Sequence, residues 1–480
     1  MFRIIPHEGD SRFLLIAEKV TFSETLGKGD TDNHELKRVM VSRGPSNNAS
    51  YGPELESDSR TRTAYDRHGM PTITRQKRVW TLVLTTVVLA AAVEAQDWLQ
   101  WRGPNRDGVI ASFREPSTWP KALTKRWTVE VGTGYATPLV AGDRVYVFTR
   151  QGENEVLSTL DAATAKVIWR TSYRASFKMN PATAPHGPGP KSTPTLADNR
   201  LFTLGISGIV TAFDPQTGKQ IWQRPAGPVE PLFHTAMSPL VVGNLMVLHV
   251  GGHNNGALTA FDVATGEARW SWKGDGPAYG SPLLFNLSGT PQVVTFTQQN
   301  FVGVAMATGN LLWRRPYTTA AVTTSQTPIL YKDTVIEMGR GNGVTAFRAI
   351  PGAGEWKTEN VWHTDEVSMH MSDAVAIDGV LFGLSHLNSG QYFALDLDSG
   401  KVLWKSDPRQ ASHAAIACAG TTIFSLQDDA KLLVIRHNRT RFDPIARYDV
   451  ATSETWTQPV VSGNRIFVKD VSSLTLWTID

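Results

Sequence analysis

Apolar and polar residues alternate along this chain in short runs that are interrupted by turn residues. Five copies of one pattern are LDAATAKVIW (160–169), FDPQTGKQIW (213–222), FDVATGEARW (261–270), VAMATGNLLW (304–313) and LDLDSGKVLW (395–404). Asp at the start of a turn accepts hydrogen bonds from N–H groups ahead of it, and Gly takes the left-handed conformation that closes a short hairpin. The pattern therefore predicts a strand, a tight turn and a second strand that ends in Trp.

Thr-Gly-Lys at 217–219 also has the look of the end of a phosphate-binding loop. Such a loop needs four residues between two glycines before Lys and Ser/Thr, and that frame is missing here. The motif returns along the chain, with Ala165 in place of Gly in the first copy and Ala305 in place of Asp in the fourth. A non-Gly residue in the left-handed conformation costs about 1 kcal/mol. A turn tolerates such replacements and a nucleotide site does not, so we interpret the motif as a turn.

A second pattern places a small residue and Pro before a short strand, a polar turn and another strand. Its copies are ATPLVAGDRVYVF (136–148), STPTLADNRLFTL (192–204), MSPLVVGNLMVLH (237–249), GSPLLF (280–285), QTPILYKDTVIEM (326–338) and TQPVVSGNRIFVK (457–469). Weaker copies without Pro are SDAVAIDGVLFGL (372–384) and AAIACAGTTIFSL (414–426). Four strands per unit of about 45 residues are typical of a propeller blade.

The two ends of the repeat region predict that the ring closes. The eighth unit supplies only three strands, the last being LTLWTID (474–480), whereas LTKRWTVEVG (123–132) precedes the first unit as a single strand. Pairing them completes a blade and removes both free edges. The predicted fold is all-β: an eight-bladed β-propeller of four-stranded antiparallel blades. Aromatic residues close each unit and are expected to pack between blades: Trp127, Trp169, Trp222, Trp270, Trp313, Trp362 and Trp404, with Tyr448 in the seventh place.

Composition fits this fold and excludes some classes of function. The 40 Gly, 27 Pro and 15 Trp suit many turns and a recurrent buried aromatic residue. Lys and Arg number 47 against 44 Asp and Glu, and no basic stripe is visible, which argues against nucleic-acid binding. Cys418 is the single cysteine, so no disulfide framework is expected, and its apolar strand pattern favours a packed thiol over a nucleophile.

Residues 70–95 are predicted to be a signal peptide. TRQKRVWTLVLTTVVLAAAVEAQ (74–96) has a basic start, a short apolar run and Val93-Glu94-Ala95 before Gln96. The run is shorter than the ~20 residues that span a bilayer, so no transmembrane anchor is expected in the mature chain. Residues 1–69 are interpreted as a start assigned too far upstream, or as a disordered extension. We expect cleavage near Ala95, an extended segment over 96–122, the propeller over 123–480, and a periplasmic or secreted protein.

The A/D-x-x-T-G-x-x-x-W repeats in eight four-stranded units resemble the pyrrolo-quinoline quinone (PQQ) repeat superfamily. That superfamily includes quinoprotein alcohol dehydrogenases and the propeller lipoprotein of the outer-membrane assembly machine. QDWLQWRGPNRDGV (96–109) resembles the opening of exported PQQ-like propellers. The resemblance covers about 96–480 and implies the ring, but one ring serves both catalysis and scaffolding. The chain lacks the adjacent cysteine pair and recognisable calcium-binding and catalytic residues of the dehydrogenases, and also the lipid-bearing cysteine of the assembly subunit.

In such a ring, the loops leading into each first strand and the loops between second and third strands open on one face around the channel. We call this the channel face. Candidate ligand-binding residues on it are Tyr135, His186, Lys191, His253, Asp275, Tyr279, Arg340, His370, His386, His413 and Trp456.

One position in each unit is especially informative: the residue three places before the motif Pro or its equivalent, which we call the lead-in position. The eight lead-in residues are Tyr135, Lys191, Ala236, Tyr279, Ser325, His370, His413 and Trp456. Five of the eight are aromatic or imidazole groups, which suits a funnel that stacks on a flat ligand. The competing interpretation is that loop residues are polar because water solvates them.

Three functions remain open from the sequence. The first is a binding or scaffold module whose channel face holds another envelope protein or a polymer. The alternative is a PQQ-dependent dehydrogenase that oxidises an alcohol or sugar, with calcium holding PQQ and a base such as His370 or His413. Sugar binding at the aromatic mouth is the third. Oxygen ligands available to calcium are Asp275, Asn388, Asp428 and Asp429, and no His or Cys spacing typical of zinc is present.

Overall fold

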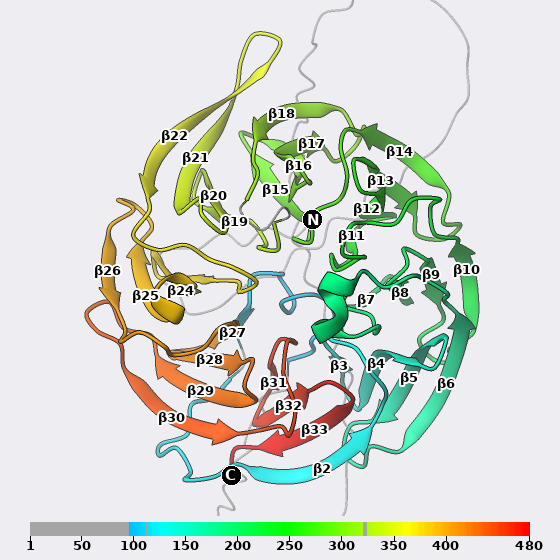
Figure 1. The fold of residues 1–480 in the computed structure, drawn as a ribbon, viewed down its shortest axis with the longest axis vertical. Coiled ribbons are helices and arrows are strands. Elements are labelled where there is room, and N and C mark those ends of the chain that lie inside the picture. Colours follow the sequence, from blue (N-terminus) through cyan, green and yellow to red (C-terminus); the bar gives the residue numbers. More distant parts are fainter. Residues whose placement is uncertain (1–95, 112, 320–323) are drawn as a thin grey trace, which may run out of the picture. The chain divides into compact units, whose positions relative to one another are not determined.

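The computed structural model describes residues 96–111, 113–319 and 324–480, which form a ring of eight sheets around a central channel (Figure 1). Each sheet contains a four-stranded antiparallel meander, so the predicted all-β, eight-bladed propeller is confirmed. The predicted extension and signal peptide, residues 1–95, lie outside the described residues and stay predictions. No helix in the described ranges is both long and apolar enough to cross a membrane.

The blades are numbered in chain order, and their strands run from the channel outward. Blades 1 and 2 are β3 (Leu139–Ala141), β4 (Arg144–Gln151), β5 (Asn154–Asp161), β6 (Val167–Arg174), and β7 (Thr195–Ala197), β8 (Arg200–Leu204), β9 (Val210–Phe213), β10 (Gln220–Arg224). Blades 3 and 4 are β11 (Leu240–Val242), β12 (Leu245–Gly252), β13 (Asn255–Asp262), β14 (Ala268–Lys273), and β15 (Leu283–Leu287), β16 (Thr290–Phe296), β17 (Asn300–Ala305), β18 (Leu311–Pro316).

Blades 5 and 6 are β19 (Ile329–Tyr331), β20 (Thr334–Met338), β21 (Val344–Pro351), β22 (Trp356–Thr364), and β23 (Val375–Ile377), β24 (Val380–Ser385), β25 (Gln391–Asp396), β26 (Val402–Lys405). Blades 7 and 8 are β27 (Ala414–Ala419), β28 (Thr422–Gln427), β29 (Lys431–Arg436), β30 (Pro444–Asp449), and β31 (Val460–Ser462), β32 (Arg465–Lys469), β33 (Ser473–Thr478), β2 (Thr124–Glu130). Two short 3₁₀ turns, η1 (Pro181–His186) and η2 (Leu387–Ser389), lie in loops.

The ring closes as the sequence predicts, because β2 pairs antiparallel with β33 and places Trp127 opposite Leu476 in blade 8. Lys469 reinforces this closure. Its ammonium donates to the carbonyls of Gly132 (3.2 Å) and Gly134 (2.7 Å), which follow β2, and burial lowers its pKa to about 8. A buried cation is tolerated here because backbone carbonyls replace its water shell.

The repeated turns hold neighbouring blades together, because a turn within one blade contacts the tryptophan of the blade before it. In blade 2, Asp214 accepts hydrogen bonds from the N–H groups of Gln216 and Thr217. Gly218 has a φ of 71°, and a Cβ added there would lie 2.4 Å from the ring of Trp169 in blade 1. Trp169 in turn donates its Nε1–H to the carbonyl of Pro215 at 3.2 Å. The turn therefore serves as the seat for the neighbouring blade's tryptophan.

The same seat recurs around most of the ring. Indole N–H groups reach carbonyls of the next blade at 2.7–3.1 Å for Trp127, Trp222, Trp270, Trp362 and Trp404. Glycines 266, 309 and 400 lie against the indole rings of the preceding blades as Gly218 does. The seventh-place residue differs, since Tyr448 donates its hydroxyl to the Pro120 carbonyl, in the segment before β2.

Trp313 is an exception to this arrangement. Its indole N–H donates to Gln292 in its own blade at 2.7 Å, and its ring meets Phe347 of blade 5 edge-on at 5.4 Å. The strands β21 and β22 extend into a long hairpin beyond the ring (Figure 1), and their connection lacks a short turn of the kind that seats Trp169. Without that seat, Trp313 packs inward and is 3% exposed.

The segment before the first blade lies inside the channel (Figure 1), and we call residues 97–110 the channel segment. Trp98 pairs through its backbone with Val140 of blade 1, and Trp101 donates its indole N–H to Thr327 of blade 5 at 3.0 Å. The segment ends in β1 (Val109–Ile110), which pairs parallel with β27 of blade 7.

Two arginines fix the middle of the channel segment. Arg106 donates to the carbonyls of Ser238 (3.1 Å) and Pro239 (2.7 Å) in blade 3. Arg102 donates to the Ala374 carbonyl and lies 3.4 Å from the carboxylate of Asp373 in blade 6. The two arginines are 3% and 1% exposed, and burial lowers the pKa of Arg106 to about 9. The channel segment therefore occupies the axis of the ring and contacts blades on opposite sides of it.

Candidate functional site

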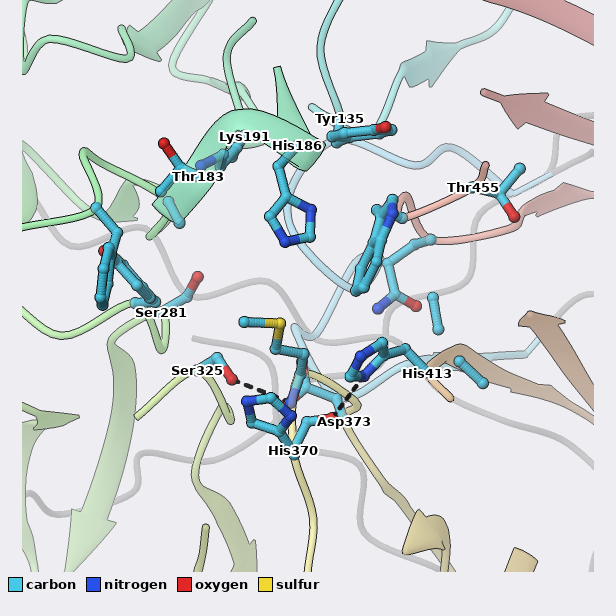
Figure 2. A pocket seen from close by; sticks show the side chains of 18 of the residues that line it. Tyr135, Thr183, His186, Lys191, Ser281, Ser325, His370, Asp373, His413 and Thr455 are labelled. Atoms are coloured by element: carbon cyan, nitrogen blue, oxygen red, sulfur yellow. Dashed lines mark hydrogen bonds between the residues drawn. The ribbon is translucent and has the colours of Figure 1, made fainter. Parts of the chain in front are cut away.

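A pocket of about 390 Å³ opens at the channel face, and Figure 2 shows the side chains around it. All eight lead-in residues line it. They converge because each immediately precedes the innermost strand of its blade, so the eight-fold repeat brings one residue per blade to the axis. Other residues that line the pocket are Trp101, Ala182, Thr183, His186, Phe233, Ser281, Arg340, Met371, Asp373, Ala414, Ala415, Thr455 and Gln458.

One side of the pocket is a nearly continuous wall of rings from blades 1, 8, 7 and 6. The Trp456 indole lies 4.7 Å from the rings of both His186 and His413, and 6.5 Å from Tyr135, between ring centroids. His413 continues the wall to His370 at 5.3 Å. Edge-on and tilted contacts of this kind hold rings in place while leaving part of their faces open to a ligand.

The wall histidines are neutral near pH 7. Burial lowers the pKa of His370 to about 4 and also lowers the pKa values of His186 and His413. The Nδ1 of His413 lies 3.0 Å from the His370 carbonyl, and because a carbonyl only accepts, Nδ1 carries the proton. Nε2 of His413 is then the acceptor of that ring.

The remaining lead-in residues, from blades 2 to 5, are Lys191, Ala236, Tyr279 and Ser325, and the Tyr279 ring lies 6.2 Å from that of Phe233 between centroids. Lys191 forms no hydrogen bond or ion pair with the residues that the structure describes, and burial lowers its pKa to about 8. The Tyr279 hydroxyl is also buried, and burial raises its pKa, although the backbone N–H of Phe233 opposes that rise. These groups are costly to bury unless a ligand or water pairs with them.

Arg340 provides the second cation, from the loop between β20 and β21. Its charge acts on His370, His386 and His413, whereas that of Lys191 acts on His186 and His234. Arg340 is exposed and makes no ion pair within the described ranges. The pocket is therefore bounded by cations on two different sides.

The channel segment contributes to the inner lining of the pocket through Trp101. Next to it, Asp373 accepts from the backbone N–H of Thr327 at 2.7 Å and faces Arg102. Burial raises the pKa of Asp373, and Arg102 and the Thr327 hydrogen bonds oppose that rise. Among the lining residues that the structure describes, Asp373 is the only acidic one, and Arg102 balances its charge.

Eight of the eleven predicted ligand-binding residues line this pocket, and three do not. His253 lies beside Gln298, 3.5 Å from its amide nitrogen. Asp275 accepts from the Gln299 N–H at 3.2 Å and from the Asn300 side chain, so it connects its own loop to the turn between β16 and β17. His386 contacts Ser368 and stands behind His370, 6.2 Å away between ring centroids. Whether any of the eleven binds a ligand remains a prediction.

Several lining residues were not predicted from the sequence. Trp101 belongs to the channel segment, which no repeat encodes. Asp373 takes the place of the motif Pro in the copy at 372–384, three residues after His370, so its position in the repeat was available as a signal. Gln458 directly precedes the motif Pro459, so its position in the repeat was available as a signal, although it is one step from the Pro rather than three. Phe233 and η1 come from long loops between blades, where no periodicity applies.

The described residues do not fit PQQ held by calcium. They contain no group of three or more His, Cys, Asp or Glu side chains arranged to hold a metal ion. The proposed calcium ligands are engaged separately: Asp428 accepts from the His413 N–H, Asp429 pairs with Lys431, and Asn388 donates to Gln391. Calcium needs six to eight oxygen ligands at one point, so we derive no reaction step through a quinone.

The ring, the repeat and the channel-face pocket define a class of protein, the eight-bladed propellers built from PQQ-like repeats. A family model described as "Outer membrane protein assembly factor BamB" matches residues 153–406, which is more than half of the chain. The chain belongs to this family, and the resemblance expected from the repeats is confirmed.

The individual proteins of similar sequence or structure include assembly factors and a dehydrogenase. The chain is 25% identical over 343 residues to "Outer membrane protein assembly factor BamB" of Burkholderia pseudomallei, covering 63% of this chain and 85% of that protein. "Methanol dehydrogenase [cytochrome c] subunit 1" of Paracoccus denitrificans is 25% identical over 221 residues, 41% of this chain and 34% of that protein. The crystal structure of BamB from Moraxella catarrhalis superimposes with a TM-score of 0.54 at 16% identity, covering 74% and 98%, which shows the fold alone.

Proposed function

We propose that this chain is an exported binding module that uses its channel face to hold another envelope protein or a polymer. The observation that supports this proposal most is the convergence of all eight lead-in residues on one pocket, which is lined by a wall of rings from blades 6, 7, 8 and 1 and by the cations Lys191 and Arg340. The likeness to outer membrane protein assembly factors supports a scaffold role, because those relatives are longer matches than the methanol dehydrogenase.

Export follows from the predicted signal peptide. We infer that the mature chain begins at Gln96, which places the channel segment at its start. Edman sequencing or mass spectrometry of the protein purified from its own cells tests this. A first residue at Gln96 is expected, and native protein that retains residues 1–69 would contradict it.

Selective loss of partner binding tests the proposed function. Immobilised protein is incubated with an envelope extract of its own cells, and bound proteins are quantified by mass spectrometry. Trp456→Ala combined with His413→Ala is expected to lose specific partners at least tenfold. The control is Gln216→Ala combined with Lys219→Ala, in an exposed turn of the opposite face, and it should retain them. Equal binding by both variants, or loss with the control alone, would contradict use of the channel face.

The dehydrogenase alternative makes a separate prediction. Adding PQQ and calcium to the purified protein is expected to give neither a stoichiometric quinone spectrum nor dye-coupled oxidation of alcohols or sugars, since no calcium ligands converge in the described residues. Oxidation that disappears with His370→Ala would restore the enzyme interpretation.

A further inference from the structure

We propose that the outer edge of blades 1 and 2 docks on a membrane surface that carries anionic lipids. The contact is made by three aliphatic residues, Val167, Ile168 and Ile221, which we call the rim patch, together with the cations beside them. The rim patch lies on the perimeter of the ring and is separate from the channel face. The inference therefore goes beyond the proposed function and does not depend on it.

The rim patch contains the most exposed aliphatic side chains of the residues that the structure describes. Val167, Ile168 and Ile221 are 49%, 46% and 45% exposed, more than any other large apolar side chain there. The strands β6 and β10 follow one another along the perimeter (Figure 1), and Trp169 of β6 packs on Gly218 in the turn that leads into β10. Single exposed aliphatic residues are ordinary on a protein surface, whereas a group of them on adjacent elements indicates a contact surface.

A β-bulge sets the direction of two of these side chains. The register of β6 against β5 shifts between Val167 and Trp169, which leaves Ile168 without a partner across the ladder. The register of β10 against β9 shifts in the same way around Ile221. A bulge re-aims a side chain, and the exposure of Ile168 and Ile221 shows that both are aimed at solvent.

The other six outer strands have the same bulge, but they do not expose aliphatic residues on adjacent blades. In blades 3 and 8 the bulged residue is an arginine: Arg269 pairs with Asp262 at 2.8 Å, and Arg126 pairs with Asp480 at 2.6 Å. In blade 5 it is Val361, which is 38% exposed. In blades 4, 6 and 7 it is half-buried: Leu312, Leu403 and Ile445. The bulge therefore belongs to the fold, and the exposed pair belongs to blades 1 and 2.

The charge beside the rim patch sets the sign of the surface that it meets. The residues 161–174 and 214–224 contain two carboxylates, Asp161 and Asp214, against five cations, Lys166, Arg170, Arg174, Lys219 and Arg224. Arg174 pairs with Glu153, which leaves four cations against the two carboxylates. The matching stretch of blade 3, 262–273, has two residues of each sign. The rim patch is therefore bordered by an excess of positive charge, which is complementary to anionic lipid headgroups.

The shape of this surface favours a bilayer over a protein partner. The rim patch lies on outer edge strands at the convex perimeter of the ring (Figure 1), so a protein would need a concave surface to cover it. A bilayer interface adapts to separate aliphatic side chains and attracts basic residues at the same time. The like charges of Arg170 on β6 and Arg224 on β10 also oppose strand pairing between two copies of the chain. Export, which the sequence predicts, brings the chain next to such membranes.

Co-sedimentation of the purified protein with sucrose-loaded vesicles tests the proposal. The vesicles are made of phosphatidylcholine with and without phosphatidylglycerol, so that they differ in charge. We expect the partition coefficient at low ionic strength to be at least tenfold higher on the anionic vesicles. It should fall at about 0.5 M salt, because salt screens the attraction between the cations and the headgroups. Equal partitioning on both lipids, or none on either, would overturn the proposal.

Aliphatic variants locate the contact. Ile168→Ser with Ile221→Ser is expected to lower partitioning on anionic vesicles at least tenfold, because the side chains that enter the interface are gone. The matched control, Ile350→Ser with Val361→Ser, removes two exposed aliphatic side chains from blade 5 and should partition as wild type does. Thermal unfolding verifies that both variants are folded. Wild-type partitioning of the first variant, or an equal loss with the control, contradicts docking through the rim patch.

Charge variants test the preference for anionic lipid. Lys166→Gln with Lys219→Gln should lower the ratio of partitioning between anionic and neutral vesicles at least threefold. Lys357→Gln with Lys401→Gln removes two exposed lysines from blades 5 and 6 and should leave that ratio unchanged. A ratio that does not respond to the first pair, or that responds equally to both pairs, would show that the cations beside the rim patch do not select the lipid.

A fluorescent probe reports the contact directly. Cys418 is the single cysteine and is buried, so Ile168→Cys provides one accessible thiol for an environment-sensitive dye in the folded protein. Emission of the dye should shift to shorter wavelength on anionic vesicles, whereas the same dye on Val361→Cys should not shift. Sedimentation of the labelled protein without a shift at position 168 would place the lipid contact on another surface and end the proposal.

Discussion

The two faces of this ring are built from the same repeat, but they differ in how much the residues at equivalent positions vary from one blade to the next. On the turn face, Asp, Thr and Gly recur because the turn must seat the tryptophan of the neighbouring blade, as Gly218 does for Trp169. On the channel face, the lead-in position holds Tyr, Lys, Ala, Ser, His or Trp, so the repeat requires no one residue type there. Packing therefore fixes one face and leaves the other to recognition.

The largest expected effect lies where the channel segment meets the blades. Arg102→Met removes the cation that faces the buried Asp373, and an unpaired buried charge costs about 3–5 kcal/mol of unfolding free energy. Denaturant unfolding measures the loss. Adding Asp373→Asn should restore much of it, because the uncompensated charge is gone. A single variant as stable as wild type would show that the channel segment contributes little to the ring.

On the turn face, Gly218→Ala is expected to lower the free energy of unfolding by about 2–4 kcal/mol. About 1 kcal/mol comes from the left-handed backbone and the rest from the clash with the Trp169 ring. Gln216→Ala, in the same turn but exposed, is the control and should change stability by less than about 0.5 kcal/mol. Equal stability of the two variants would mean that the turn does not seat the indole.

The pH dependence of stability reports on the channel face. The pKa of Lys191 is lowered from 10.5 to about 8 in the folded chain, so between these values the unfolded chain binds more protons. Stability conferred at this site must therefore rise as the pH increases from about 8 towards 10. Lys191→Met should lack this part of the rise. Lys469, whose pKa is also lowered to about 8, is present in both proteins and cancels in the difference. If the stabilities of wild type and Lys191→Met depended on pH in the same way, the lowered pKa of Lys191 in the folded chain would be contradicted.

The smallest effect is expected at a channel-face residue outside the pocket. His253→Ala should change stability by less than about 0.5 kcal/mol and leave capture of envelope proteins unchanged, since within the described residues the His253 side chain hydrogen-bonds only Gln298, at 3.5 Å, and its backbone bond to Glu230 is kept in the variant. The capture experiment and denaturant unfolding check the two expectations. A clear loss of binding would extend the site beyond the lead-in positions.

Periodicity explains which features could be predicted from the sequence. The closure of β2 onto β33 and the convergence of the lead-in residues follow from counting strands, because each is repeated or complements a repeat. The positions of His253, Asp275 and His386 depend on loop length and local hydrogen bonds, which counting does not capture. Trp313 departs from the pattern because the blade after it has a different hairpin.

The channel segment was the main feature that could not be predicted. Its sequence was distinctive, but its partners lie in blades 1, 3, 5, 6 and 7, far away along the chain. In the sequence, Arg102 and Arg106 look like ordinary surface charges, because the blade carbonyls that they bind lie far away along the chain. A single non-repeating segment offers no internal copy from which its contacts can be inferred.

The position of the channel segment also constrains how the molecule is assembled. The residues that leave the ribosome before any blade bind to strands made much later, and β2 waits for β33, which ends two residues before the C-terminus. The channel segment and β2 must therefore remain without these partners until β27 and β33 have been made. The ring closes only when every blade is present, and the segments made before its first blade dock among the last.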